Sequence, residues 1–220
     1  MGYYQGRPIV LCKDFNTRDA VFTPFNGVGE SSFERDKELY SDTFEDITHV
    51  LMDNSKITLV SEIIDKFWNM YIIDALIGNF DRHGANWGFI KKDNVYRMAP
   101  IFDNGSSLFP RRNSEELMIE AMTNDAVISD MTYKYPLSQI RIGKRKSSYY
   151  DVIFSLEFDA CNLALKRIYP RINLTKIFKM IDLEDMLSNL QKKFYRYIIQ
   201  YRFEHIIKKS YQKLVGEENE

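Results

Sequence analysis

The fold of this 220-residue chain is decided by Asn79-Phe80-Asp81-Arg82-His83-Gly84-Ala85-Asn86 and, a little further on, Ile101-Phe102-Asp103-Asn104-Gly105. Phosphoryl transfer needs one carboxylate to orient and deprotonate a hydroxyl, and it needs oxygen ligands that hold Mg²⁺ on the phosphates. Asp81 fits the first need, and Asn86 with Asp103 fits the second. The alternative is a polar turn, because Asp and Asn also favour turns and helix caps.

The residues on either side predict how the two stretches meet in space. Residues 61–77 predict a helix, because apolar residues and Asp74 recur at helical spacing before Gly78. Residues 87–90 and 95–99 flank a polar turn, which is typical of a β-hairpin. The first polar stretch precedes this hairpin and the second follows it, so we expect their side chains to lie close together.

The rest of the chain predicts a short strand, a loop and a helical remainder. Residues 8–12 are apolar and predict a buried strand. Residues 16–46 contain Pro24, Gly27 and many charges, which favours a loop with a short helix near residues 33–40. After Pro110 we expect helices near residues 114–122, 149–156, 158–167, 175–181 and 183–214.

Composition favours a cytoplasmic protein. The net charge of −1 creates no global field that would attract nucleic acid or a membrane surface. Cys12 and Cys161 lie far apart without a metal-ligand spacing, as expected in a reducing cytosol. No apolar run approaches the roughly 20 residues of a membrane span. The basic cluster at residues 141–146 is either a nucleic-acid patch or a solvated turn between helices, and the absence of interleaved aromatic residues favours the turn.

Two motifs together resemble those of a known family. Residues 81–86 resemble the catalytic loop D-x-H-x-x-N of HipA-like serine/threonine kinases, and residues 99–108 resemble the metal-binding segment of the same family. The resemblance implies an α+β, mostly helical fold, namely a kinase-like large lobe whose small β-hairpin carries the catalytic loop and the metal-binding segment. It implies a hinge-like strand at residues 1–15, a loop-rich connection at residues 16–60 and the C-terminal kinase lobe at residues 61–215. The acidic end, residues 216–220, is expected to be a disordered tail.

The resemblance also implies ATP and Mg²⁺ as cofactors, with roles for single residues. Asp81 matches the catalytic Asp, Asn86 and Asp103 match the magnesium ligands, and His83 matches a loop-organising His near the phosphates. Arg82 matches a phosphate contact or a loop anchor. The hinge-like segment would hold the adenine through its backbone. The implied nucleotide contacts are Cys12, Lys13, Asp14, Arg82, His83, Asn86, Phe102 and Asp103.

One departure from the family pattern keeps alternatives open. In the family, the phosphate-covering loop and the nucleotide-binding Lys precede the hinge, whereas here the hinge-like strand begins near residue 8 and Lys13 cannot replace that Lys. The expectation is a truncated protein kinase that lacks the ATP-clamping lobe. The alternatives are an inactive kinase-like binding module and the large subunit of a split kinase. A metal-dependent hydrolase is disfavoured, because two of the three His residues belong to no cluster.

The resemblance names classes of partner as well. It implies a protein substrate, and it leaves room for a separate small-lobe chain or an antitoxin chain. Relatives include toxins of toxin–antitoxin pairs and secreted bacterial effectors, so a bacterial host and, besides the cytoplasm, a secreted location are implied. Direct contact with nucleic acid is not expected.

Overall fold

The computed structural model describes residues 2–32, 44–53, 60–93, 95–142 and 145–217, and the short helix expected near residues 33–40 lies outside them. The strands are β1 (Gly2–Tyr4), β2 (Arg7–Ile9), β3 (Ala20–Pro24), β4 (Gly88–Lys92), β5 (Val95–Met98), β6 (Leu137–Ile142) and β7 (Arg145–Ser148). The helices are α1 (Phe25–Ser32), α2 (Phe44–Asp53), α3 (Val60–Ile77), α4 (Glu115–Thr123), α5 (Asp125–Ser129), α6 (Tyr149–Ser155), α7 (Asp159–Ile168), α8 (Leu174–Asp182), α9 (Asn189–Arg202) and α10 (Lys209–Glu217).

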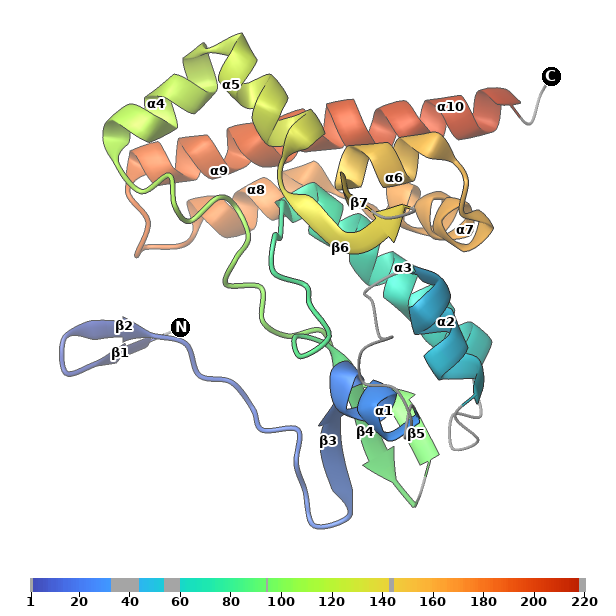
Figure 1. Cartoon of the computed structure of the whole chain (residues 1–220). Helices are drawn as coiled ribbons and strands as arrows, with labels where there is room; N and C mark the ends of the chain where they lie inside the picture. The colour runs from blue at the N-terminus through green and yellow to red at the C-terminus, as the bar shows by residue number, and fades with distance from the viewer. Residues whose placement is uncertain (1, 33–43, 54–59, 94, 143–144, 218–220) are drawn as a thin grey trace.

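The predicted hairpin is strands β4 and β5, which pair antiparallel from Lys92↔Val95 to Phe89↔Met98. Strand β3 adds to the other edge of β4, from Ala20↔Lys92 to Pro24↔Gly88. The expectation of a loop over residues 16–46 was therefore wrong for β3 and α1. Figure 1 shows this three-stranded sheet with α1 at one end of the molecule and the later helices at the other, with two loops running between them.

Helix α1 is held to the sheet by aromatic packing. Phe25 is buried and stacks on Trp87, with ring centroids 4.2 Å apart and planes 13° apart. The sequence of α1, Phe-Asn-Gly-Val-Gly-Glu-Ser-Ser, contains two Gly residues and few strong helix formers. The helix is therefore stabilised mainly by tertiary contacts such as this one and the burial of Val28, which local sequence patterns do not reveal.

Gly88 allows the corner between β3 and α1 to lie directly on β4. A Cβ atom at Gly88 would collide with the carbonyl oxygen of Thr23 and come within 2.7 Å of the Cα of Pro24. We therefore expect Gly88→Ala to lower the free energy of unfolding by about 1–3 kcal/mol in urea denaturation, because backbone rather than a flexible side chain must move. Gly27→Ala is the matched control, since its Cβ would meet ordinary contacts of 3.7 Å or more. Equal stability of the two variants would contradict this account.

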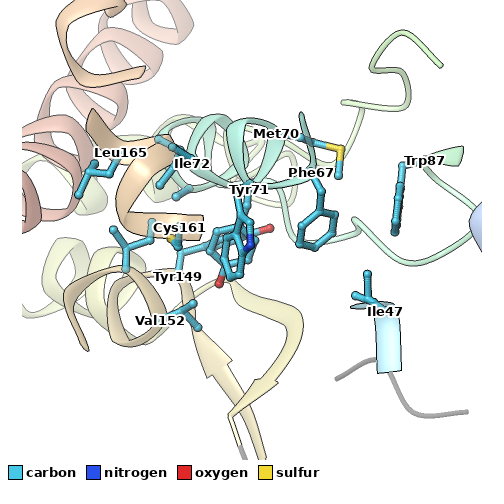
Figure 2. Close-up of a cluster of buried hydrophobic side chains, with 14 of the residues drawn as sticks. Ile47, Phe67, Met70, Tyr71, Ile72, Trp87, Tyr149, Val152, Cys161 and Leu165 are labelled. Atoms are coloured by element: carbon cyan, nitrogen blue, oxygen red, sulfur yellow. The ribbon is translucent and has the colours of Figure 1, made fainter. Parts of the chain in front are cut away.

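Helix α3 forms the centre of the helical part, and its beginning, end and burial agree with the prediction. Its buried residues include Phe67, Trp68 and Tyr71, and α7 packs against it. Figure 2 shows side chains of α3 between Tyr149, Val152, Cys161 and Leu165 on one side and Trp87 with Ile47 on the other. Because this core joins the helices to the sheet, it fixes where the loop after α3 can run. Within the described ranges, none of the helices combines the length and the apolar character needed to cross a bilayer.

Three further expectations differ from the structure. The expected helix over residues 183–214 begins only at Asn189, where Ser188 and Gln191 form a capping box, and π-helical backbone interrupts it at Phe203–Lys208. In the basic cluster, residues 141–142 and 145–146 lie in the paired strands β6 and β7 rather than in a turn, and residues 143–144 lie outside the described residues. The buried strand expected at residues 8–12 ends at Ile9, and the exposed fractions of Val10 and Leu11 are 69% and 82%.

Candidate active site

Both polar stretches are attached to the C-terminal end of α3. Gly78 ends the helix with a φ of +65°, a left-handed conformation that favours glycine. The backbone N–H of Asn79 then donates to the carbonyl oxygen of Asp74 at 3.0 Å. The N–H of Leu108, just beyond the second stretch, donates to the carbonyl oxygen of Ile77 at 2.8 Å. The two stretches therefore share one point of attachment.

Arg82 joins the two stretches to each other and to α3. Its Nη1 donates to the carbonyl oxygens of Asn86 and Phe102, each at 2.6 Å. Its Nε and Nη2 donate to the Asp74 carboxylate at 2.8 and 3.0 Å, and Nη2 also donates to Oδ1 of Asn104 at 2.6 Å. These bonds use all five N–H groups of the guanidinium. Arg82 and Asp74 are 7% and 1% exposed, so this ion pair is buried.

Asn79 and Tyr149 form a second support beneath the loop. The side chain of Asn79 donates to Asp74 at 3.0 Å and accepts from the backbone N–H of Asp81 at 3.2 Å. The hydroxyl of Tyr149, on α6, donates to the carbonyl oxygen of Asn79 at 2.8 Å. Burial raises the pKa of Tyr149 well above its usual range, so the hydroxyl keeps its proton and remains a donor at neutral pH.

Helix α1 holds the loop from the opposite side. The first N–H groups of α1, those of Phe25 and Asn26, donate to the carbonyl oxygens of Trp87 and Gly84 at 3.0 and 3.1 Å. A Cβ atom at Gly84 would lie 3.3 Å from Cβ of Asn26, so the two backbones approach closely. Helix α1 thus fixes the second part of the loop, at Gly84 and Trp87, by backbone hydrogen bonds.

Asp81 and His83 lie side by side and reach solvent. Their side chains are 45% and 44% exposed, and Nε2 of His83 is 3.7 Å from Oδ1 of Asp81. The backbone N–H of Ala85 donates to Nδ1 of His83 at 3.2 Å. Nδ1 is therefore the acceptor, and the proton of a neutral ring lies on Nε2, the nitrogen nearer to Asp81. This arrangement leaves the carboxylate accessible to a hydroxyl and gives it a neighbouring donor.

Asn86 and Asp103 provide two oxygen ligands of the kind that Mg²⁺ prefers. Nδ2 of Asn86 donates to the carbonyl oxygen of Asp81 at 2.7 Å, which leaves Oδ1 available to coordinate a cation. Asp103 is exposed and has a φ of +50°, and no hydrogen bond or ion pair joins its carboxylate to another described residue. One amide oxygen and one carboxylate suit Mg²⁺, which also keeps water and phosphate ligands. The residues present therefore fit the ion.

Comparison with known proteins agrees with this geometry. The family model for the HipA-like C-terminal domain matches residues 25–165. The chain belongs to the HipA-like C-terminal domain family. The family assignment predicted from the two motifs is therefore confirmed, and the matched residues include α1, both polar stretches and the helices that support them.

One match in sequence and one in structure make the resemblance more specific. This HipA-like chain is 32% identical over 210 residues to the serine/threonine-protein kinase CtkA of Helicobacter pylori strain J99, and the alignment covers 94% of the chain and 64% of that relative. It also superimposes on a crystal structure titled as a Helicobacter pylori proinflammatory kinase CtkA, with a TM-score of 0.87, 30% identity, and coverage of 94% of this chain and 76% of that one. The mostly helical α+β fold, a kinase-like C-terminal lobe, is thus confirmed.

The structure changes the reading of some predicted nucleotide contacts. Arg82 was placed among them, but its five N–H groups are all used inside the protein, so it fits the loop-anchor alternative instead. Phe102 packs its ring against Phe15 and Phe22, with centroids 5.6 and 5.2 Å away. Cys12, Lys13 and Asp14 lie exposed between β2 and β3, and their adenine contacts stay a prediction. The same holds for the roles of Asp81, His83, Asn86 and Asp103.

Sequence reasoning did not assign a role to several residues that hold the site. They are Asp74, Asn79, Asn104, Tyr149 and, on α1, Asn26. One signal was available for Asp74, because an acidic residue among the buried apolar positions of a helix needs a partner. No comparable signal exists for Tyr149, whose contact with Asn79 spans 70 residues of sequence.

Proposed function

We propose that this HipA-like chain carries the phosphoryl-transfer site of an ATP- and magnesium-dependent kinase that phosphorylates Ser or Thr of a protein substrate. The proposal rests mainly on the hydrogen bonds of Arg82 to the carbonyl oxygens of Asn86 and Phe102. These hydrogen bonds connect the backbone segment of Asp81 and Asn86, the proposed base and one proposed magnesium ligand, to the segment of Asp103, the other proposed ligand. The printed name of the relative CtkA, a serine/threonine-protein kinase, supports the same activity.

In the proposed reaction, the chain mainly positions the acceptor hydroxyl. The Asp81 carboxylate accepts a hydrogen bond from the hydroxyl of Ser or Thr and takes its proton as the oxygen attacks the γ-phosphorus of ATP. The bond between the γ-phosphorus and the bridging oxygen breaks, and ADP leaves. Nε2 of His83, 3.7 Å from Oδ1 of Asp81, offers a donor beside the carboxylate. Positioning and charge stabilisation dominate phosphoryl transfer, so a fixed loop matters more than a strong base.

Asn86 and Asp103 would hold Mg²⁺ on the phosphates. When bound, the ion neutralises charge on the β- and γ-phosphate oxygens. Arg82 contributes indirectly, because its bonds to the carbonyl oxygens of Asn86 and Phe102 fix the backbone that carries the two ligands, and Asn79 fixes the backbone of Asp81. The free thiols of Cys12 and Cys161 are compatible with the cytoplasmic location that we propose.

Loss of a magnesium ligand should change the magnesium dependence of the reaction. We expect Asp103→Ala to raise the Mg²⁺ concentration needed for half-maximal transfer of labelled γ-phosphate by at least about tenfold. Because Asp103 is exposed and joined to no described side chain, the expected loss of stability is only about 1 kcal/mol, which comes from placing Ala at a φ of +50° where Asp is better tolerated. Asp185→Ala, in the exposed turn between α8 and α9, is the control. An unchanged magnesium dependence would remove Asp103 from the proposed ligand set, and absence of phosphate transfer by the parent chain would contradict the kinase proposal.

A further inference from the structure

A groove opens directly beside the proposed catalytic residue. Its volume is about 480 Å³, and Phe80, the residue before Asp81, forms part of its wall. The other walls come from the segment after Asp103, from the end of the π-helical turn at Asp130–Lys134, and from the β6–β7 hairpin. We call it the Phe80 groove. Asp81 itself does not line the groove, but its chain neighbour Phe80 does, so the groove adjoins the proposed catalytic residue along the chain.

The floor of the Phe80 groove is apolar. Its apolar lining residues are Phe80, Phe109, Met131, Tyr135, Pro136 and Leu137. Tyr135 and Leu137 are 58% and 41% exposed, although both are large and mainly apolar. Exposed apolar area concentrated in a concave site is typical of a binding site, because covering it removes that area from water. The groove thus suits an apolar side chain of a partner.

The rim of the Phe80 groove is basic. Arg111, Arg112 and Lys146 line it, and none of the described residues that line it is acidic. The guanidinium of Arg111 lies 5.5 Å from the centre of the Phe80 ring, and it forms no ion pair with another described residue. Arg112 is held by Glu120 at 3.0 Å, so part of its charge is already balanced. Arg111 is therefore the rim cation best placed to meet an incoming carboxylate.

A buried cation beneath the floor adds to the positive potential. Arg202, on α9, donates from Nη1 to the carbonyl oxygens of Met131 and Tyr135 at 2.6 and 3.1 Å. Its Nη2 is buried without a hydrogen-bond partner among the described residues. Burial lowers the pKa of Arg202 to about 10, so the side chain remains charged at neutral pH. A positive charge in a poorly hydrated site attracts anions more strongly than one in water.

We propose that the Phe80 groove binds the protein substrate through an apolar side chain flanked by Asp or Glu, close in sequence to the Ser or Thr that is phosphorylated. The inference rests on the proposed kinase function and deepens it by naming the substrate class. The apolar residue fills the floor, and the acidic neighbours meet Arg111 and the positive potential of the rim. Charge complementarity and the position next to Asp81 select this occupant.

Binding is tested without requiring catalysis. A short fluorescent peptide carries one Leu between Glu residues and Ala at the acceptor position, and fluorescence anisotropy with the full chain gives its Kd. We expect Leu→Ser in the peptide to raise the Kd roughly tenfold, since burial of a Leu side chain is lost. We expect Arg111→Glu to raise the Kd of the Glu peptide by about fivefold. The same variant should bind more tightly a second peptide in which Lys replaces each Glu. Lys176→Glu, at an exposed position on α8, is the control and should leave the Kd of both peptides unchanged.

The outcomes separate this inference from the kinase proposal. No binding, equal binding of Glu and Lys peptides, or equal effects of Arg111→Glu and Lys176→Glu would overturn the inference. ATP hydrolysis without peptide, measured on the same variants, should not change in Arg111→Glu. If that hydrolysis persists while the peptide preference is absent, the groove assignment fails and the kinase proposal stands. If the peptide preference is found and no phosphate is ever transferred, the groove assignment stands and the kinase proposal fails.

Discussion

Replacing Asp81 with Asn should slow phosphoryl transfer by about 10³-fold and leave the unfolding temperature unchanged. Asn has nearly the same shape but cannot accept the proton of the acceptor hydroxyl. The contacts that hold position 81 come from its backbone, since its N–H donates to Asn79 and its carbonyl oxygen accepts from Asn86 and from the N–H of His83. These bonds survive the substitution. The measurement is transfer of labelled γ-phosphate from ATP to a Ser- or Thr-containing protein, together with thermal unfolding.

The control is a change of the same chemistry away from the site. Asp185→Asn alters an exposed carboxylate between α8 and α9 and should leave the rate of transfer unchanged. His83→Gln should give an intermediate loss, because Asp81 keeps its chemistry but loses the ring beside it. If Asp81→Asn transferred phosphate as fast as the parent chain, another residue would have to act as the base.

Local patterns in the sequence were enough to predict the motifs and the elements that flank them. The helix before the first motif and the hairpin after it follow from side-chain periodicity and turn residues, and both agree with α3, β4 and β5. Strand β3 and helix α1 were missed, because their stability depends on pairing with β4 and on the contact of Phe25 with Trp87. Such tertiary contacts override weak local propensity.

The sequence was enough to predict which side chains carry the chemistry of the candidate site, but not which hydrogen bonds hold them in place. Asp81, Asn86 and Asp103 carry side chains whose type and spacing indicate their proposed roles. The direction of Arg82 could not be predicted, because a loop Arg can face phosphates or the interior equally well. Its partners Phe102 and Asn104 lie 20 and 22 residues away in sequence. Only the folded chain reveals that this guanidinium is fully used as an anchor.

The hinge-like segment at residues 8–12 was predicted to be buried because it is apolar, and for Val10 and Leu11 this prediction was wrong. Val10 and Leu11 are apolar, but the chain leaves the β1–β2 pairing at Ile9 and continues exposed toward β3. An apolar run indicates burial only when another element is present to cover it. The basic residues Arg141, Arg145 and Lys146 illustrate the reverse case, because the backbone pairing of β6 with β7 places charged residues in strands.

Replacing Arg82 with Met should lower the free energy of unfolding by about 3–5 kcal/mol, the largest stability effect that we expect in this chain. The substitution leaves the Asp74 carboxylate buried without its cation, and it removes the donors to Asn86, Phe102 and Asn104. Urea unfolding measures the change. The surface ion pair of Arg167 with Asp65 is the control, and Arg167→Met should cost less than about 1 kcal/mol, since both side chains remain partly in water.

A double substitution separates two effects of Arg82→Met, namely the unpaired buried charge of Asp74 and the lost hydrogen bonds to the loop carbonyl oxygens. Asp74→Asn removes the buried negative charge and still offers an oxygen to Asn79, so adding it to Arg82→Met should recover about 1–2 kcal/mol of stability. Phosphate transfer should not recover, because no side chain then joins the carbonyl oxygens of Asn86 and Phe102. If the double variant regained both stability and transfer, Arg82 would act only by neutralising Asp74. If it regained neither, the donors to the loop carbonyls would account for the whole effect, since removing the charge would have brought no gain.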